Sequence, residues 1–328
     1  MPKNTIFFND IKPQPTEWLW EPFIPMDKLT IVQGDPGCGK STLLLNLAAA
    51  VTKGQQFPEK KVVSVGSYVL YQNAEDGLHD TVRPRLDAAD ADPEMVFTID
   101  ESEESLEFCD TEFVRAIQIH RPKLVVLDPL QAYLGGSIDM HRANEVRPAM
   151  KILAKLAETY HCAIVLIGHM NKMPGQNALY RGLGSIDIAA AARSVLLVGR
   201  HPHEPEKRVV MQIKNSIAEM AKPQCFTVRE GKFVWLGECD LRETELLSAP
   251  AAQPSQLEKA MRFLKENLNE DCPEKPQHEI EELADSEDIV RATLYRAKKQ
   301  LGIFSTRHHG TLYWHIPVTP PDPEKVIY

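Results

Sequence analysis

The 328-residue sequence lacks any run of 18 uninterrupted apolar residues, so no membrane-spanning helix is expected. Its first ten residues, MPKNTIFFND, lack the basic and then apolar pattern of a secretory signal. The six cysteines are scattered without a C-x-x-C pair, which argues against a disulfide scaffold or a zinc module. Together these absences predict a cytoplasmic protein with no membrane partner. The net charge of -9 excludes a chain coated in basic residues, although a local basic face remains compatible with nucleic-acid binding.

What is present is the composition of a folded protein, with 43% hydrophobic and 25% charged residues. The length suggests about two domains. Residues 248–256 read SAPAAQPSQ, which is typical of a linker. We therefore expect one domain over residues 1–247 and a second over residues 257–317. The Pro-rich residues 318–328 are expected to form a flexible tail.

The first domain is predicted to be α/β, with a mainly parallel sheet covered on both faces. Short apolar strands are expected at residues 29–33, 68–72, 95–99, 124–127 and 163–167. Helical periodicity is seen at residues 40–53, with Gly54 as a stop signal, and at residues 143–160. Four further strands, expected at residues 194–198, 208–214, 225–229 and 232–236, predict an antiparallel extension at one edge of the sheet.

Residues 34–41, GDPGCGKS, match the phosphate-binding pattern G-x-x-x-x-G-K-[ST] between a predicted strand and a predicted helix. Glycines let backbone N–H groups turn inward around a phosphate, and the helix adds its positive end. Lys40 is expected to reach the β- and γ-phosphates and Ser41 to ligate Mg²⁺. The predicted nucleotide-binding residues are Gly34, Asp35, Pro36, Gly37, Cys38, Gly39, Lys40, Ser41 and Thr42.

Other strands are predicted to deliver polar residues to the same edge of the sheet. Asp128 follows an apolar strand and suits a position beside Mg²⁺, the alternative being a turn cap before Pro129. Glu75 suits a general base that orients the attacking water; the alternatives are a helix N-terminal carboxylate or the same role for Asp76. His169 suits a sensor of the γ-phosphate, the alternative being a buried structural histidine.

Several separate motifs occur in order over about residues 15–245, and together they resemble a known family. They read WLWEPFIPMDKLTIVQGDPGCGKST, VLYQNAED, LVVLDPLQAYL, RANEVRPAMKILAKLAE, AIVLIGHMNK and YRGLGSIDIAAAARSVLLVGR. The sequence resembles the RecA-type ATPases of the hexameric RepA helicase group, which includes phage and mobile-element replication proteins. This resemblance implies a RecA-like core, ATP hydrolysis with Mg²⁺, a homo-oligomeric ring and DNA in its channel. It implies Glu75 as the catalytic carboxylate, Asp128 as the Walker B aspartate and His169 as the sensor.

Two Gly-containing loops carry the cations expected to track a single DNA strand. Residues 131–144 contain Arg142, and residues 171–187 contain Lys172 and Arg181. The alternative is that both are ordinary surface loops.

The sequence departs from the family at a position that acts on the neighbouring subunit. Ring ATPases of this fold often place a lysine and an arginine two residues apart, whereas here residues 214–216 read KNS. Either Lys214 acts alone or Arg193 or Arg200 supplies the charge in trans.

The C-terminal domain is predicted to be a winged helix-turn-helix. Helices are expected at residues 256–268 and 278–284, with a third that is capped by Ser286 or Asp285 and ends near residue 301. Residues 303–306 and 311–316 suit a β-wing. The third helix and wing carry the cations expected to contact duplex DNA, namely Arg291, Arg296, Lys298, Lys299 and Arg307. The alternative is a module for protein contacts or self-assembly.

The sequence therefore predicts a Mg²⁺-dependent ATPase that acts on DNA, as a ring-forming replicative helicase or a helicase-like replication protein of a phage or mobile element. One alternative is an ATP switch, such as a recombination mediator, that binds DNA without unwinding it. A third is a regulatory binding protein whose ATPase controls assembly.

Overall fold

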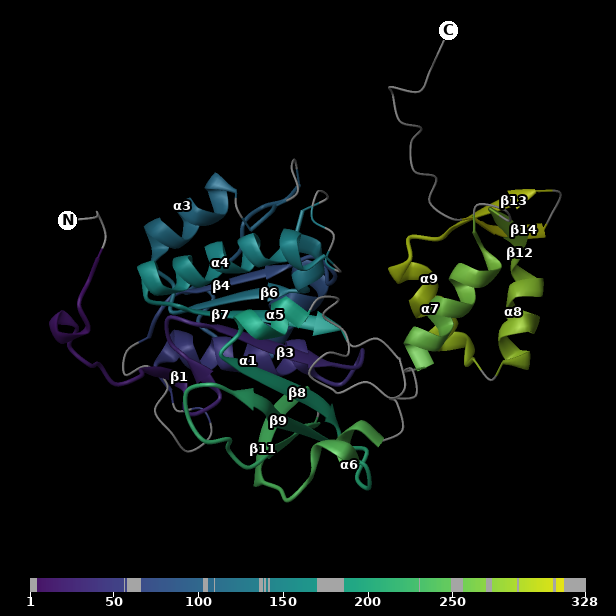
Figure 1. Ribbon diagram of the computed structural model, residues 1–328. Helices are drawn as coiled ribbons and strands as arrows, with labels where there is room; N and C mark the ends of the chain where they lie inside the picture. Colours follow the sequence, from purple (N-terminus) through teal and green to yellow (C-terminus); the bar gives the residue numbers. More distant parts are fainter. Residues whose placement is uncertain are drawn as a thin grey trace, which may run out of the picture. The chain divides into compact units, whose positions relative to one another are not determined.

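The computed structural model divides into two compact units, residues 1–251 and 252–328 (Figure 1). It describes residues 5–55, 57, 66–102, 106–108, 110–135, 138, 140, 142–169, 186–229, 231–248, 256–269, 273–287, 289–308 and 311–315. The predicted linker core (249–255) and the tail (318–328) lie outside these residues. None of the described helices is long and apolar enough to cross a bilayer.

The first unit is built on a nine-stranded sheet in the order β11-β10-β9-β8-β3-β7-β6-β4-β5. Six strands are parallel: β3 (Leu29–Gly34), β4 (Val69–Asn73), β5 (Val96–Phe97), β6 (Leu124–Asp128), β7 (Ala163–His169) and β8 (Ser194–Arg200). Three continue it in antiparallel fashion: β9 (Lys207–Asn215), β10 (Gln224–Arg229) and β11 (Lys232–Glu238). The predicted α/β fold, with a mainly parallel sheet and an antiparallel extension, is confirmed.

Both faces of the parallel strands are buried because helices cover each side. Along β6, Val126 joins one apolar cluster while Val125 and Leu127 join the other, which is the period of two that a strand imposes. The first cluster includes α1 (Lys40–Lys53), the π-helical turn η2 (Leu78–Val82) and α2 (Arg83–Ala88). The second includes α3 (Thr111–His120), η3 (Leu130–Tyr133), α4 (Ala143–Tyr160) and α5 (Ile186–Ala191), and Figure 1 shows α3 and α4 together on one side of the sheet.

The helix-stop signal at Gly54 is confirmed. Gly54 has φ of 62°, and its N–H bonds to the carbonyl oxygens of Ala50 and Val51 at the end of α1. The remaining short elements of this unit are η1 (Phe8–Asp10), β1 (Trp18–Trp20), β2 (Ile24–Pro25) and α6 (Glu243–Ser248).

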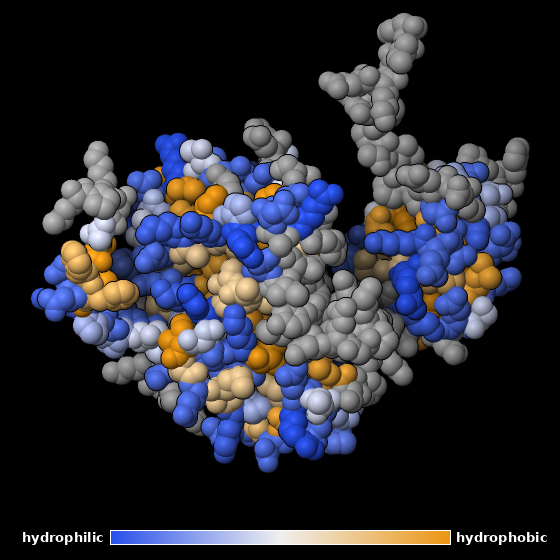
Figure 2. All heavy atoms as spheres, in the orientation of Figure 1, coloured by the Kyte–Doolittle hydropathy of each residue, from blue (hydrophilic) through white to orange (hydrophobic). Residues whose placement is uncertain are grey.

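The N-terminal segment of the first unit exposes apolar side chains. Ile6, Phe7 and Phe8 are 73%, 64% and 90% exposed, and Ile11 is half exposed. Figure 2 shows hydrophobic side chains gathered over this segment. Clustered exposure of large apolar groups is typical of a surface that binds another protein.

The second unit combines three helices with a three-stranded antiparallel sheet in the order β12-β14-β13. Its elements are α7 (Gln256–Asn267), β12 (Glu274–Pro276), α8 (Gln277–Ser286), α9 (Arg291–Gln300), β13 (Phe304–His308) and β14 (Thr311–His315). Phe263, Leu264, Ile280, Leu294 and Trp314 are buried in its own core.

The predicted start of the third helix is wrong. Asp285 and Ser286 are the last residues of α8, where the Ser286 hydroxyl donates to the Leu283 carbonyl, and α9 begins at Arg291 after an extended Val290. Apolar packing by Ile280 and Ala284 carries α8 past the residues that were expected to cap the next helix.

Candidate active site

The loop between β3 and α1 has the backbone expected of a phosphate-binding loop. Gly37 and Gly39 have φ of 70° and 100°, a region that favours glycine. A Cβ on Gly34 would lie 2.1 Å from the Val198 carbonyl oxygen of β8, so a side chain there has no room. The glycines at these three positions are therefore required both by the turn and by its packing on the sheet.

Lys40 is held inside this loop. Its side chain is 4% exposed, and Nζ donates to the carbonyl oxygens of Gly34 (2.9 Å) and Asp35 (3.0 Å). Cys38 is buried beside it, and burial raises the pKa of the thiol despite the opposing charge of Lys40. The loop therefore positions an ammonium group where the predicted phosphates would bind.

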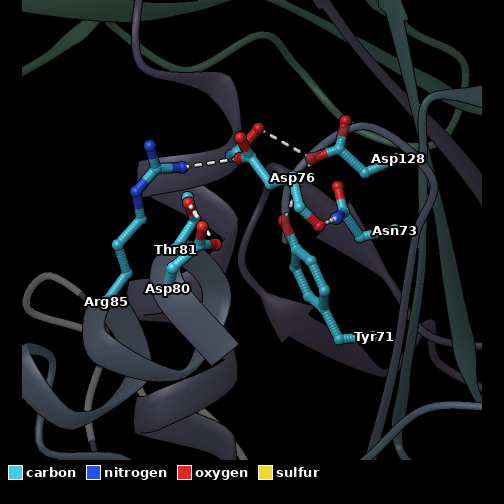
Figure 3. A network of polar contacts seen from close by, with 8 residues as sticks. Tyr71, Asn73, Asp76, Asp80, Thr81, Arg85 and Asp128 are labelled. Carbon is cyan, nitrogen blue, oxygen red and sulfur yellow. Dashed lines mark hydrogen bonds and ion pairs between the residues drawn. The ribbon is translucent and has the colours of Figure 1, made fainter. Parts of the chain in front are cut away.

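Ser41 and Asp128 meet across the sheet edge although 87 positions separate them in the chain. The Ser41 hydroxyl donates to Oδ2 of Asp128 (2.7 Å), and so does the buried Tyr71 hydroxyl (3.0 Å; Figure 3). Burial and the adjacent Asp128 carboxylate raise the pKa of Tyr71 well above its ordinary value, so the phenol stays a donor. The structure thus brings the two predicted metal residues together and adds a tyrosine that the sequence analysis missed.

A second set of polar contacts fixes the turn after β4, which carries Glu75. The Asn73 side-chain amide donates to the Asp76 carbonyl oxygen (2.6 Å), and the Ala74 N–H donates to the Asp128 carbonyl oxygen (3.0 Å). The Asp76 carboxylate forms an ion pair with Arg85 of α2 at 2.8 Å (Figure 3). This ion pair gives Asp76 a structural use, while Glu75 is exposed in a turn held against the end of β6.

His169 ends β7 at a position paired with Gly34 in the parallel register. Its backbone therefore lies beside the start of the phosphate-binding loop, while its side chain falls outside what the structure describes. Lys172 and Arg181 also lie outside the described residues. Arg142 is exposed, and its Nη1 lies 3.3 Å from Oε1 of Glu145.

Lys214 is used within its own subunit. Its Nζ donates to the carbonyl oxygens of Ala189 (2.8 Å), Ala190 (3.3 Å) and Ala192 (2.7 Å) at the end of α5. Burial, with the nearby charge of Arg193, lowers the pKa of Lys214. Arg193 is exposed.

Arg200, the other cation considered for a role in trans, lies beside the phosphate-binding loop of its own chain. Its Nη2 is 3.4 Å from the Gly37 carbonyl oxygen. Arg208, which the sequence analysis did not single out, is its cross-strand partner.

The five predicted cations of the second unit fall into two groups. Arg291 is ion-paired with Glu281, and the Lys298 ammonium lies 4.3 Å from the centroid of the Trp314 ring. The remaining three, Arg296, Lys299 and Arg307, are exposed.

The donor set at the sheet edge fits Mg²⁺. A serine hydroxyl and an aspartate carboxylate are the hard oxygen ligands that this ion prefers, and it completes its shell with phosphate oxygens and water. No cluster of three or more His, Cys, Asp or Glu side chains suited to a metal exists within the described part of the chain. Ser41 and Asp128 are therefore suited to an ion that arrives with a phosphate ligand.

Comparison with known proteins gives a consistent picture. A family model described as an AAA domain matches residues 2–175. The DNA repair protein RadA of Bacillus subtilis (strain 168) is 29% identical over 147 residues, which is 44% of this chain and 28% of RadA. RadA of Streptococcus pneumoniae is 27% identical over 147 residues, 44% of this chain and 30% of RadA. The chain thus spans less than a third of the length of these relatives.

Proposed function

Because the chain belongs to the AAA domain family, whose model covers just over half of it, we propose that it is a Mg²⁺-dependent ATPase acting on DNA, as a ring-forming helicase-type replication protein. The observation that carries this proposal is the contact between Ser41, directly after the loop lysine, and Asp128 at the end of β6. That contact joins the phosphate loop and a metal-binding carboxylate into one hydrolytic site.

In the proposed mechanism, the loop amides and Lys40 bind the phosphates, and Lys40 exchanges its bonds to Gly34 and Asp35 for phosphate oxygens. Ser41 and Asp128 hold the metal, which when bound offsets negative charge on the phosphate oxygens. Glu75 orients the attacking water and accepts its proton. The backbone position of His169, next to Gly34, suits a side chain that senses the γ-phosphate.

DNA is the proposed partner for three reasons. The matching relatives carry the name DNA repair protein, the loops with Arg142, Lys172 and Arg181 are cationic, and the second unit has a suitable topology. We assign it as a winged helix, because its helices and strands follow the order α7-β12-α8-α9-β13-β14 with the two-stranded wing last. In this assignment α9 enters the major groove of a duplex, while single strands pass through the ring.

The proposed assembly is a homohexameric ring. The exposed Ile6, Phe7 and Phe8 supply an apolar contact to a neighbouring copy. Across that contact Lys214 or Arg193 approaches the neighbour's nucleotide.

The test is ATP hydrolysis by wild type and by Glu75→Gln, with nucleotide binding measured in parallel. Glu75→Gln is expected to bind ATP normally and to lose roughly 10²- to 10⁴-fold in turnover, because only the general base is removed. Lys40→Ala is the control that loses binding. If Glu75→Gln sustains turnover while Asp76→Asn does not, Asp76 is the base.

A second candidate function, an ATP switch that holds DNA without unwinding it, is favoured by the match to repair proteins and by Ser216 where an arginine is usual. Turnover with and without single-stranded DNA, followed by displacement of a tailed duplex, separates the two functions. Stimulated turnover with strand displacement supports the helicase. Binding of single strands without displacement supports the switch.

A further inference from the structure

Two arginines from neighbouring strands converge on the phosphate-binding loop from the side opposite to Asp128. Arg200 ends β8, Arg208 lies near the start of β9, and the two are register partners. Nη2 of Arg200 lies 3.4 Å from the Gly37 carbonyl oxygen. The Arg208 side chain would come within 3.8 Å of a Cβ placed on Gly39.

These two cations are close together and partly buried without a paired anion. Arg208 Nη1 donates to the carbonyl oxygens of Pro205 and Glu206, both at 3.1 Å, and Arg200 Nη1 approaches Pro205 at 3.4 Å. Within the described part of the chain, neither arginine forms an ion pair, and Nε of Arg200 is buried with no hydrogen-bond partner. Burial and the charge of Arg200 lower the pKa of Arg208.

Such an arrangement is unfavourable by itself, since each guanidinium loses water and repels the other. A bound anion would relieve both costs. The hairpin that carries the two arginines is braced for this purpose, because the His201 N–H bonds to the Lys207 carbonyl oxygen (3.0 Å) and the Thr227 hydroxyl bonds to the Glu206 carbonyl oxygen (2.8 Å). The charges are therefore preorganised rather than free to swing away.

The sheet order decides which part of a nucleotide lies there. β3 leads into the loop, with β7, β6 and β4 on one side and β8 and β9 on the other. Asp128 and Glu75 follow β6 and β4, so the reacting γ-phosphate belongs on that side. The opposite end of the polyphosphate must then lie toward β8 and β9.

We propose that Arg200 and Arg208 bind the α-phosphate end of the nucleotide held by their own subunit. This inference rests on the proposed function, because it requires a nucleotide in the loop. It assigns Arg200 a role in cis rather than in trans. It also means that ADP and ATP share this contact, since both carry the α-phosphate.

The experiment measures the affinities of full-length Arg200→Gln and Arg208→Gln for ADP and for a non-hydrolysable ATP analogue by calorimetry. Each variant is expected to weaken both ligands by a similar factor, about tenfold, because a charge-assisted hydrogen bond to phosphate is lost. Arg229→Gln, an exposed arginine at the far end of β10, is the matched control and should bind as wild type does. Unchanged affinity for ADP in both variants would overturn the proposal.

Two further measurements keep the result interpretable. In wild-type protein, ADP should protect Arg200 and Arg208, but not Arg229, from an arginine-specific reagent such as phenylglyoxal, which needs no variant to fold. Mixing Arg200→Gln with Glu75→Gln subunits should not restore hydrolysis, because a cis defect stays with its own site; restoration would contradict the assignment. If Lys40→Ala binds nucleotide normally, the proposed function fails, whereas its loss beside normal Arg200→Gln and Arg208→Gln binding refutes only this inference.

Discussion

At the scale of single residues, Tyr71 is the contact that most directly shapes the proposed metal site. Its hydroxyl and that of Ser41 both donate to one carboxylate oxygen, so Asp128 is held in a single orientation. Tyr71 is 2% exposed, so the hydrogen bond is shielded from water. We classify it as a positioning residue, because it acts through Asp128.

Replacing Tyr71 with phenylalanine should raise the Mg²⁺ concentration needed for half-maximal ATP hydrolysis by about tenfold, the cost of losing one hydrogen bond to a charged group. Nucleotide binding without Mg²⁺ and thermal stability should change little, because the ring still fills its space. Tyr68→Phe is the control, since Tyr68 lies 40% exposed just before the same strand. An unaltered Mg²⁺ titration in Tyr71→Phe would show that the hydroxyl does not position Asp128.

How much of the site could be predicted at this scale depends on how local its signals are. The loop from Gly34 to Ser41 and the strand-end Asp128 are recognisable because each depends on neighbours in sequence. Tyr71, Arg85 and Arg208 were missed because their contacts depend on strand register and on helix placement. The one local signal for Tyr71 was a hydroxyl within an otherwise apolar strand.

At the scale of elements, Lys214 joins β9 to α5. Its ammonium binds three carbonyl oxygens at the C-terminal end of the helix, which no longer have intrahelical donors. Lys214→Met should therefore increase hydrogen exchange over residues 186–192 and lower the free energy of unfolding by about 1–3 kcal/mol. Lys222→Met, an exposed lysine after the same strand, should leave both unchanged. Equal exchange in the two variants would rule out the capping role.

In the second unit, Glu281 connects α8 to α9. Burial alone would raise the pKa of this carboxyl, but hydrogen bonds from Tyr295, Arg291 and Gln277 outweigh it and lower the pKa below the ordinary 4.5. The ionised group therefore stabilises the fold fully above pH 4.5, and that stabilisation is lost as pH falls toward the lowered pKa.

Glu281→Gln should accordingly speed hydrogen exchange over residues 277–300 at pH 7 by about tenfold, since an ion-paired acceptor is lost. The difference from wild type should shrink at pH values below 4.5, where wild-type Glu281 also becomes neutral. Glu279→Gln, exposed on the same helix, is the control. A difference that does not depend on pH would mean that the charge of Glu281 is not responsible.

The elements themselves were largely predictable from period and punctuation. Residues 143–160 coincide with α4, and the strand at 29–33 is one residue short of β3. β12 was missed because three residues, Glu-Lys-Pro, carry no alternation. The start of the third helix was wrong because apolar packing, which no local signal records, carried α8 through two good capping residues.

At the scale of the whole molecule, the chain divides into two units with separate cores, and the proposed function assigns hydrolysis to one and duplex binding to the other. The cations of the second unit that are not used internally are Arg296, Lys299 and Arg307. Replacing all three with alanine should weaken duplex binding and flatten its salt dependence by up to about three units of log K per log salt, one for each phosphate contact.

Hydrolysis in the absence of DNA should be unaffected by that triple change, which anisotropy with a labelled duplex and a phosphate-release assay would measure on the same preparation. Arg262→Ala with Lys265→Ala, on α7, provides the control for charge removed elsewhere in the unit. Retained duplex affinity in the triple variant would favour a protein-binding role for α9 and its wing.

The position of β3 has a consequence for how this site withstands fluctuation. Four strands lie on each side of it, so it is the middle strand of nine. Openings that fray a sheet start at its rims, where ladders are unpaired on one flank. The segment that presents Gly34 and Lys40 is thus the last to be reached by such fraying, and partial melting at either margin leaves the loop's anchoring strand paired.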